Sequence, residues 1–200
     1  EPIRLDGRLD ESEYRDMEPI TGFYQSLPQD GASASEKTEA WVMFDDENVY
    51  VSARLWESAP RSEWIANEMR RDTQQLRNND TFTAQFDTFF DRRNGVFFYT
   101  NFLGARADQQ FSNEGNPNPD WNPIWDVRTA QFEGGWSVEM QIPFKSLRYR
   151  PGREQVWGLQ LRRVIRRKNV IFDGAVHSLR RFQDEVAAGL PSGHGLADGG

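Results

Sequence analysis

Two stretches of alternating apolar and polar residues, separated by a short acidic turn, most strongly constrain the fold of this chain. Residues 38–44 (TEAWVMF) precede the turn, and residues 49–56 (VYVSARLW) follow it, with one face formed by Val49, Val51, Ala53 and Leu55. A period of two is typical of a β-strand that buries one face, and a polar turn between two such runs indicates a hairpin. The sequence therefore predicts an antiparallel β-hairpin over residues 38–56.

Further strand patterns follow along the chain, and each is bounded by turn residues. They cover residues 82–87, 96–101, 127–132, 136–142 and 156–167. The first two flank residues 91–95 (DRRNG), and the next two are joined through residues 133–135 (EGG). The pairs Asn-Gly and Gly-Gly in these segments are frequent in turns between antiparallel strands.

Two short helices interrupt the strand patterns. One is predicted over residues 11–17 with Asp10 as its N-cap, and the other near residues 144–147, after Pro143. The remaining elements are about eight or nine strands joined by hairpin turns, without a repeated alternation of strand and helix. We therefore predict an all-β fold, an antiparallel β-sandwich of jelly-roll-like form with one or two short helices.

The strand patterns suggest one large domain followed by a tail. We assign residues 1–183 to the β-sandwich, and residues 184–200 to a Gly-rich linker that leads to a missing downstream domain. Residues 111–125 (FSNEGNPNPDWNPIW) contain three Pro and four Asn, which predicts a long ordered loop. Long loops of this kind often carry function.

Composition limits the classes of function. Aromatic residues make up 13% of the chain, which suits the half-buried surfaces of β-strands. The formal net charge is −7, and a surface of this sign repels phosphate backbones, so nucleic acid is not expected as a partner. The chain has no cysteine, which excludes a disulfide framework, a thiolate metal site and a cysteine nucleophile.

Several short motifs follow one another in a characteristic order. They are residues 3–11 (IRLDGRLDE), 45–51 (DDENVYV), 70–72 (RRD), 91–95 (DRRNG), 104–108 (GARAD), 135–139 (GWSVE) and 142–148 (IPFKSLR). This ordered set resembles the family 9 carbohydrate-binding-module-like domain, in the version found N-terminal to bacterial outer-membrane β-barrels of unknown function. The resemblance covers residues 1–170.

The resemblance implies a β-sandwich that belongs to a larger exported bacterial protein, located in the periplasm or at the cell surface. It implies a glycan or polysaccharide ligand, and a downstream outer-membrane barrel domain in the same chain. Relatives attached to xylanases bind the ends of sugar chains between two tryptophans. One of those tryptophans corresponds to residues 76–79 (LRNN) here, an acidic residue corresponds to the vicinity of Thr83, and an arginine corresponds to residues 96–98. The resemblance thus implies that the fold persists while the sugar site is altered.

Tryptophans are the first candidates for contacts with a sugar, because pyranose faces are apolar and stack on flat rings. Four of them lie within or next to strand patterns and are expected in the core: Trp41, Trp125, Trp136 and Trp157. Three others lie at strand ends or in loops and are candidate ligand-binding residues: Trp56, Trp64 and Trp121. The alternative for these three is that each packs a loop onto the sandwich.

Polar side chains near residue 100 are the second candidates. Arg106 and Asp108 have the spacing of residues that share one face of a strand, and they follow Asn101 closely. Arginine and carboxylate groups can grip a polar ligand in a bidentate manner. The same groups, like those of residues 70–72 and 91–93, can instead form ion pairs that hold loops in place.

Two further clusters have a functional and a structural interpretation. Asp45, Asp46 and Asn48 form an oxygen-rich turn that can help to hold a structural calcium ion, although a solvated hairpin turn explains the same residues. The basic residues between 162 and 168 can pair with acidic neighbours, or can form an edge for anionic lipopolysaccharide or a barrel partner.

The sequence contains no nucleophile elbow, no phosphate-binding Gly loop and no pair of histidines at metal-ligand spacing. We therefore predict that the domain is not an enzyme. The first hypothesis is a carbohydrate-binding domain that uses aromatic stacking and hydrogen bonds from Arg, Asp and Asn side chains. The alternative is a structural or protein-interaction accessory domain of an outer-membrane barrel protein, without a sugar ligand. A glycoside hydrolase is a third, minor hypothesis.

Overall fold

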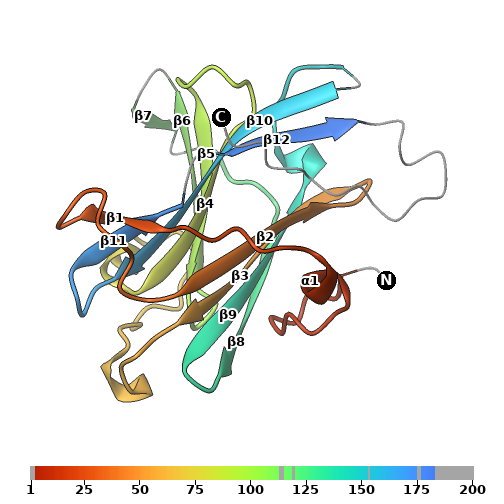
Figure 1. The fold of residues 1–200 in the computed structure, drawn as a ribbon. Coiled ribbons are helices and arrows are strands. Elements are labelled where there is room, and N and C mark those ends of the chain that lie inside the picture. The colour runs from red at the N-terminus through yellow and green to blue at the C-terminus, as the bar shows by residue number, and fades with distance from the viewer. Residues whose placement is uncertain (1–2, 113–114, 119, 153, 175–176, 183–200) are drawn as a thin grey trace.

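The computed structural model describes residues 3–112, 115–118, 120–152, 154–174 and 177–182, and it forms a sandwich of two antiparallel sheets (Figure 1). The smaller sheet has the order β2-β3-β9-β8, with β2 (Thr38–Phe44), β3 (Asn48–Trp56), β8 (Asp126–Phe132) and β9 (Gly135–Pro143). The predicted all-β sandwich is therefore confirmed. The predicted linker, residues 184–200, lies outside the described residues.

The larger sheet has eight strands in the order β1-β11-β10-β4-β5-β6-β7, with β12 also paired to β10. Its strands are β1 (Tyr24–Leu27), β4 (Thr81–Asp87), β5 (Gly95–Asn101), β6 (Arg106–Ser112), β7 (Asn116–Asn118), β10 (Glu154–Ile165), β11 (Val170–Asp173) and β12 (His177–Phe182). The helical segments are α1 (Glu13–Asp16) and the 3₁₀ helices η1 (Arg61–Glu63), η2 (Gln74–Asn78) and η3 (Phe144–Ser146). No helix among the described residues has the length and apolar character needed to cross a membrane.

The core lies between the two sheets, where strand alternation points one face of each sheet toward the other. The larger sheet contributes residues such as Phe82, Phe86 and Phe98, and the smaller sheet contributes residues such as Val51 and Met140; all five are fully buried. Trp125, Trp136 and Trp157 join this core, as expected. Trp41 is also buried, but in a second cluster on the other face of the smaller sheet.

The segment before β1 covers that second face. Leu9 and Tyr14 pack against Trp41, Met43 and Tyr50, so α1 lies on the outer side of the smaller sheet (Figure 1). The N-terminal segment thus packs on the outer side of the smaller sheet, away from the larger sheet.

Helix α1 is shorter than predicted. It begins after Ser12 rather than after Asp10, and it ends at Asp16, because Met17 is already extended. Glu11 was expected inside the helix, but its carboxylate accepts a hydrogen bond from the backbone amide of Arg4. The predicted helix near residues 144–147 is present as the single 3₁₀ turn η3.

The connection between β4 and β5 lies where the sequence predicted it, but Asn94-Gly95 does not form its tight turn. Gly95 is the first residue of β5, and the left-handed conformations lie earlier, at Phe90 and Arg92. The Asp87 carboxylate accepts hydrogen bonds from the backbone amides of Asp91 and Arg92, which holds the loop in this shape.

Two other elements differ from the expectations. The predicted loop over residues 111–125 contains the short strand β7, which pairs with β6. The long late strand ends at Ile165 rather than at residue 167, because Arg166 to Asn169 form the turn into β11, with Asn169 at a positive φ of 51°.

Candidate functional site

Each of the three candidate tryptophans is half-buried by neighbouring side chains. The Trp121 ring meets Phe98 edge to face at 5.6 Å between centroids, and the Trp64 ring meets Phe102 in the same way at 5.7 Å. Trp56 meets Phe132 at 5.6 Å. Trp64 and Trp121 pack against the main core. Each ring thus contacts a different phenylalanine, and none of these three contacts joins two of the candidate tryptophans.

Asn101 is fully buried beneath the segment that leads to η2. Its amide nitrogen donates to the Glu68 carbonyl and to Asn79 Oδ1, and its own oxygen accepts from the backbone amides of Leu103 and Ala105. These four hydrogen bonds shape the β5–β6 turn. Asn101 is therefore a structural residue of that turn, contrary to the prediction that it faces a ligand.

Arg106 and Asp108 do share one face of β6, but this face points toward Trp125 and the core. Arg106 Nη1 donates to the Trp125 carbonyl at 2.7 Å, and the Trp125 indole nitrogen donates to Asp108 Oδ2 at 2.8 Å. The Asp108 side chain is 1% exposed, and burial raises the pKa of its carboxyl. The pair holds the core residue Trp125 in place. Its side chains lie on the opposite face of the sheet from that of Asn101.

The other Arg/Asp motifs also form internal contacts. Arg71 Nη2 donates to Asp108 Oδ2, Asn122 Oδ1 and the Pro123 carbonyl, which ties the segment before η2 to the loop after β7. The hydrogen bonds of Arg70 lower the pKa of Glu68 to about 2. These motifs therefore act as loop anchors in this structure.

Four of the five basic residues between 162 and 168 are paired with carboxylates, and the fifth, Arg166, donates to the Arg77 carbonyl. Arg162 forms a two-bond contact with Asp173, while Arg163 is fully buried beside Glu57. Arg167 and Lys168 contact Glu57 and Glu36. This agrees with the interpretation that the run is matched by acidic neighbours.

The turn considered for calcium is closed by its own hydrogen bonds. Asp45 accepts from the backbone amides of Glu47 and Asn48 and from the Tyr50 hydroxyl, and these bonds outweigh the effect of burial and lower its pKa. Asp46 is exposed at the same turn. Among the described residues, no group of three or more His, Asp or Glu side chains is placed to hold a metal ion. Calcium binding here stays a prediction.

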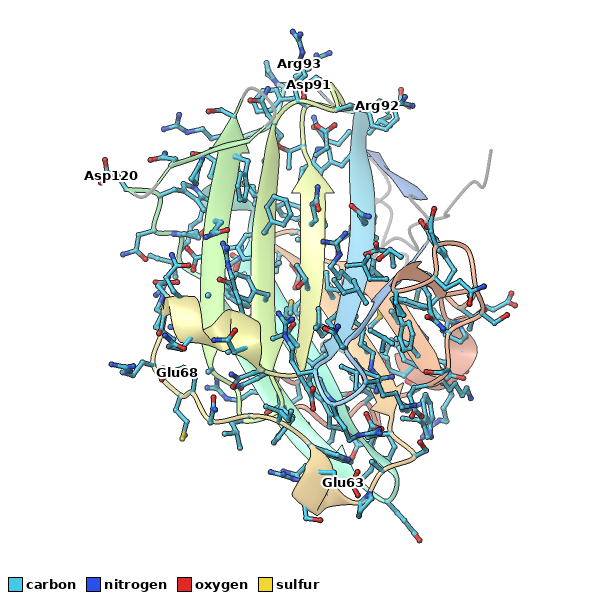
Figure 2. The ribbon with its side chains drawn as sticks, turned by 90° about the vertical axis from the view of Figure 1, so that its left-hand side faces the viewer. Glu63, Glu68, Asp91, Arg92, Arg93 and Asp120 are labelled. Carbon is cyan, nitrogen blue, oxygen red and sulfur yellow. The ribbon has the colours of Figure 1, made fainter. Side chains whose placement is uncertain are left out.

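Among the described residues, the outer face of the larger sheet is a surface that carries polar side chains without internal partners. We use "outer face" for the residues of β10, β4, β5 and β6 that point away from the core, and these strands face the viewer in Figure 2. The strand register arranges them in rows. One row contains Arg162, Thr83 and Tyr99, and the next contains Gln160, Gln85, Phe97 and Gln109.

These two rows combine aromatic rings with hydrogen-bonding groups. Tyr99 and Phe97 are neighbours on β5 and are half-buried, so part of each ring is exposed to solvent. Within the part of the chain that the structure describes, no hydrogen bond engages the side chains of Thr83, Gln85 and Gln160 or the Tyr99 hydroxyl. An amide offers both donors and an acceptor, so this surface can bind a ligand that bears hydroxyl groups.

The outer face is bounded at both ends of its strands. At one end η2 lies across the sheet, where Leu76 packs against Ala105 and Ala107, with Tyr99 beside them. At the other end lies the β4–β5 loop, in which Phe90 is 50% exposed and points toward Gly158. Figure 2 shows this loop, marked by Asp91 to Arg93, opposite the segment that carries Glu68.

Sequence reasoning missed these residues, although β5 carries a signal. Phe97, Phe98 and Tyr99 are consecutive aromatics, so a single strand presents rings on both of its faces. The Phe98 ring lies in the core, so packing explains its presence. Packing in that core does not explain the rings of Phe97 and Tyr99 on the other face. Gln85 and Gln160 became neighbours of these rings only through the register of strands far apart in the sequence.

Comparison with known proteins finds solved structures with a similar fold. No family model matches the sequence, and no curated protein matches it. A family 9 carbohydrate-binding module from Caldicellulosiruptor kristjanssonii, in complex with glucose, has a TM-score of 0.62 at 17% identity, covering 87% of this chain and 82% of that chain. The corresponding complex with cellotriose has a TM-score of 0.59 at 14% identity, covering 87% and 80%.

This chain has the fold of a family 9 carbohydrate-binding module. A protein from Bacteroides uniformis, provisionally assigned as carbohydrate-binding, shares the fold with a TM-score of 0.59 at 8% identity, covering 82% of this chain and 79% of that chain. The family 9 fold expected from the motifs is thus confirmed. Identities this low establish the fold and leave the ligand to be argued from the surface of this chain.

Proposed function

We propose that this domain binds a carbohydrate on the outer face of its larger sheet and does not transform it. The observation that carries the proposal is the pairing of exposed aromatic rings with partner-free amides in adjacent rows. Solved proteins with this fold bind glucose and cellotriose, which supports a sugar as the ligand class.

Each side chain has a role that follows from its chemistry. Tyr99 and Phe97 offer flat rings for the apolar faces of pyranoses. Gln85, Gln160 and Thr83 offer donors and acceptors for the hydroxyl groups at the edges of the sugar. A neutral hydrogen bond contributes about 0.5–1.5 kcal/mol net, so no single contact dominates and affinity depends on the set.

Isothermal titration calorimetry against a panel of soluble glycans, including glucose and cellotriose, tests this proposal. Tyr99→Ala and Gln85→Ala should each weaken the binding that the wild type shows, by about twofold to tenfold for the loss of one hydrogen-bonding side chain. Ile124→Ala serves as the control, because Ile124 is 71% exposed and lies outside the outer face. Absence of heat for every glycan would overturn the proposal.

The second candidate is an accessory domain of an outer-membrane barrel protein without a sugar ligand. It is favoured by the inward packing of Trp64 and Trp121 and by the internal contacts of Arg106 and Asp108. Exposed Leu27 and Met69 provide apolar surface for such a role. Cross-linking in cells followed by identification of the partner tests it: recovery of an envelope protein supports it, and persistence of the same cross-links after Leu27→Glu and Met69→Glu contradicts this surface.

The cellular setting belongs to the proposal as well. We propose a periplasmic or cell-surface location, within a larger exported bacterial protein that continues into an outer-membrane barrel. The support is the ordered set of motifs described above. Fractionation of cells that express the full-length protein, with detection by an antibody against this domain, tests the location.

A further inference from the structure

We propose that the outer face takes an internal stretch of an extended, neutral glycan chain that runs across the strands from β6 to β10, instead of a single terminal sugar. The inference rests on the proposed function and specifies the form of its ligand. It follows from the shape, the boundaries and the charge of the two rows of side chains.

The row of four residues extends across four adjacent strands. Gln160 on β10 lies opposite Gln85 on β4, which lies opposite Phe97 on β5, which lies opposite Gln109 on β6. Neighbouring strands lie about 4.8 Å apart, so the row spans about 14 Å. That span exceeds a single sugar ring and matches a short run of linked sugars.

The available surface is narrower in the other direction. The two rows are separated by two residues along each strand, which is about 7 Å. At one end η2 already covers the β6 end of the Tyr99 row, where Leu76 packs on Ala107 and on Ala105 beyond it. At the other end the Asp87 carboxylate is engaged by the β4–β5 loop. A chain that follows the long direction of the surface therefore crosses the strands.

Phe90 supports the second boundary. Its φ of 51° is a left-handed conformation that costs a bulky residue about 1–2 kcal/mol, and its ring is nevertheless half-exposed. The ring lies 3.9 Å from the position that a Cβ on Gly158 would occupy. The loop thus holds an aromatic ring beside the row of four, where it can flank a bound chain.

The chemistry along the row suits a repeating, hydroxyl-bearing chain. Amides lie at Gln160 and Gln85 and again at Gln109, with the Phe97 ring between them. Gln109 accepts a hydrogen bond from Arg77 through its oxygen, and its NH₂ group has no bond within the described residues. Hydrogen-bonding groups therefore lie on both sides of a stacking surface.

The charge of the two rows favours a neutral chain. The three glutamines carry no charge, and the charged residue within the rows, Arg162, is held by both oxygens of Asp173. The Asp173 side chain is only 5% exposed, so this guanidinium is already neutralised by a buried partner. An acidic sugar would have to compete with this buried carboxylate for the Arg162 guanidinium.

A chain-length series measured by calorimetry tests the inference. The probes are glucose and β-1,4-linked glucose oligomers of two to six units, with xylose and mannose oligomers of the same lengths and polygalacturonate as an anionic chain. We expect affinity to rise about tenfold or more from monomer to tetramer. Reduction of the terminal sugar of the hexamer to its alditol should leave affinity unchanged.

Variants at the two ends of the row separate this form of binding from binding at a chain end. Gln109→Ala and Gln160→Ala should each weaken binding of the tetramer several-fold, and should weaken it more than they weaken binding of glucose. Gln110→Ala is the matched control, because Gln110 lies on the same strand but on the opposite face. The thermal midpoint of each variant confirms that it is folded.

The outcomes distinguish the two proposals. If glucose binds as tightly as the tetramer, or if reduction of the terminal sugar abolishes binding, the ligand is a chain end and this inference is wrong while sugar binding stands. Tighter, salt-dependent binding of polygalacturonate would overturn the neutral chain. If no glycan binds at all, the proposed function fails and this inference fails with it.

Discussion

Gly7 and Glu139 are joined by a hydrogen bond of 2.6 Å from the Gly7 amide to Glu139 Oε2, although 132 positions separate them in the sequence. The same carboxylate accepts from the Asp6 amide and from the Tyr14 hydroxyl, and Glu139 is fully buried. Two of the motifs that characterise the sequence, at residues 3–11 and 135–139, are thus two halves of one contact. It fastens the N-terminal segment over the smaller sheet.

Replacement of Gly7 by alanine should destabilise the domain by about 2–4 kcal/mol. Gly7 has a φ of +86°, and an added Cβ would lie 2.7 Å from the backbone carbon of Thr129. The variant therefore suffers both a conformational strain and a steric overlap. Urea unfolding followed by tryptophan fluorescence measures the change.

Gly22→Ala separates the two causes. Gly22 has a similar φ of +79°, but nothing lies within 4 Å of the position of its Cβ. It should cost only the conformational part, about 1–2 kcal/mol. Equal losses for the two variants would show that the close approach of Gly7 to β8 contributes nothing.

Glu139 should make stability fall as the pH rises. Burial raises the pKa of its carboxyl above the ordinary value of 4.5, against the hydrogen bonds from Gly7 and Tyr14. The folded protein then keeps this proton where the unfolded chain has lost it. The contribution of Glu139 is therefore present below pH 4.5 and is lost as the pH rises through the raised pKa.

The measurement is the free energy of unfolding of the wild type and of Glu139→Gln from about pH 4 to about pH 7. The variant cannot titrate at this position, so the difference, wild type minus variant, should decrease as the pH rises. A constant difference would mean that the hydrogen bonds to the carboxylate balance the effect of burial, and an increase would mean that they outweigh it; either result contradicts the prediction.

Arg163 should be needed for stability. Burial lowers its pKa to about 10, while Glu57, Glu36 and Asp80 oppose that shift. Its guanidinium donates to the carbonyls of Lys37 and Trp56, which links β10 to the smaller sheet. Arg163→Met should cost about 3–5 kcal/mol, because buried acceptors and a carboxylate lose their partner.

Arg128→Met is the control for the loss of an arginine. Arg128 pairs with Asp126 at the surface, where its side chain is 52% exposed, so its replacement should cost less than about 1 kcal/mol. Chemical unfolding of both variants provides the comparison. Similar values for the two variants would contradict a special role for the buried guanidinium.

Trp121 should matter for stability and not for binding. Its ring packs against Phe98 on the core side of β5, whereas Tyr99 points to the outer face. Trp121→Ala should lower the free energy of unfolding by about 1–3 kcal/mol and leave glycan affinity unchanged. A large loss of glycan affinity in a variant that remains folded would show that Trp121 takes part in binding and would contradict this prediction.

Local patterns were sufficient to predict the hairpins. Alternation over residues 38–44 and 49–56 corresponds to β2 and β3 in the structure. The pattern did not predict that both faces of these strands are buried, one against the larger sheet and the other against the N-terminal segment. Strand β7 escaped this reasoning because a three-residue strand that contains Pro117 shows no alternation. Asp10 was expected to cap α1, but a four-residue helix leaves little pattern from which to locate its first residue.

The site was harder to predict, because it depends on register between distant strands. Thr83 was identified only as the counterpart of an acidic residue in relatives, and the structure places it opposite Tyr99 and Arg162. The spacing of Arg106 and Asp108 correctly predicted one shared face, but a strand pattern without its partners does not tell which face is covered. In the structure both residues form hydrogen bonds with Trp125, so the shared face is the one that points to the core.

The most direct test of the account is a map of the binding surface by two-dimensional ¹⁵N-¹H NMR during titration with a glucose tetramer. We predict chemical-shift changes in β4, β5 and β10, centred on Gln85, Phe97, Tyr99 and Gln160, with smaller changes near Phe90 and none near Trp56, Trp64 or Trp121. Changes centred on those tryptophans, or no changes with any glycan of the calorimetry panel, would contradict the outer face as the carbohydrate-binding surface.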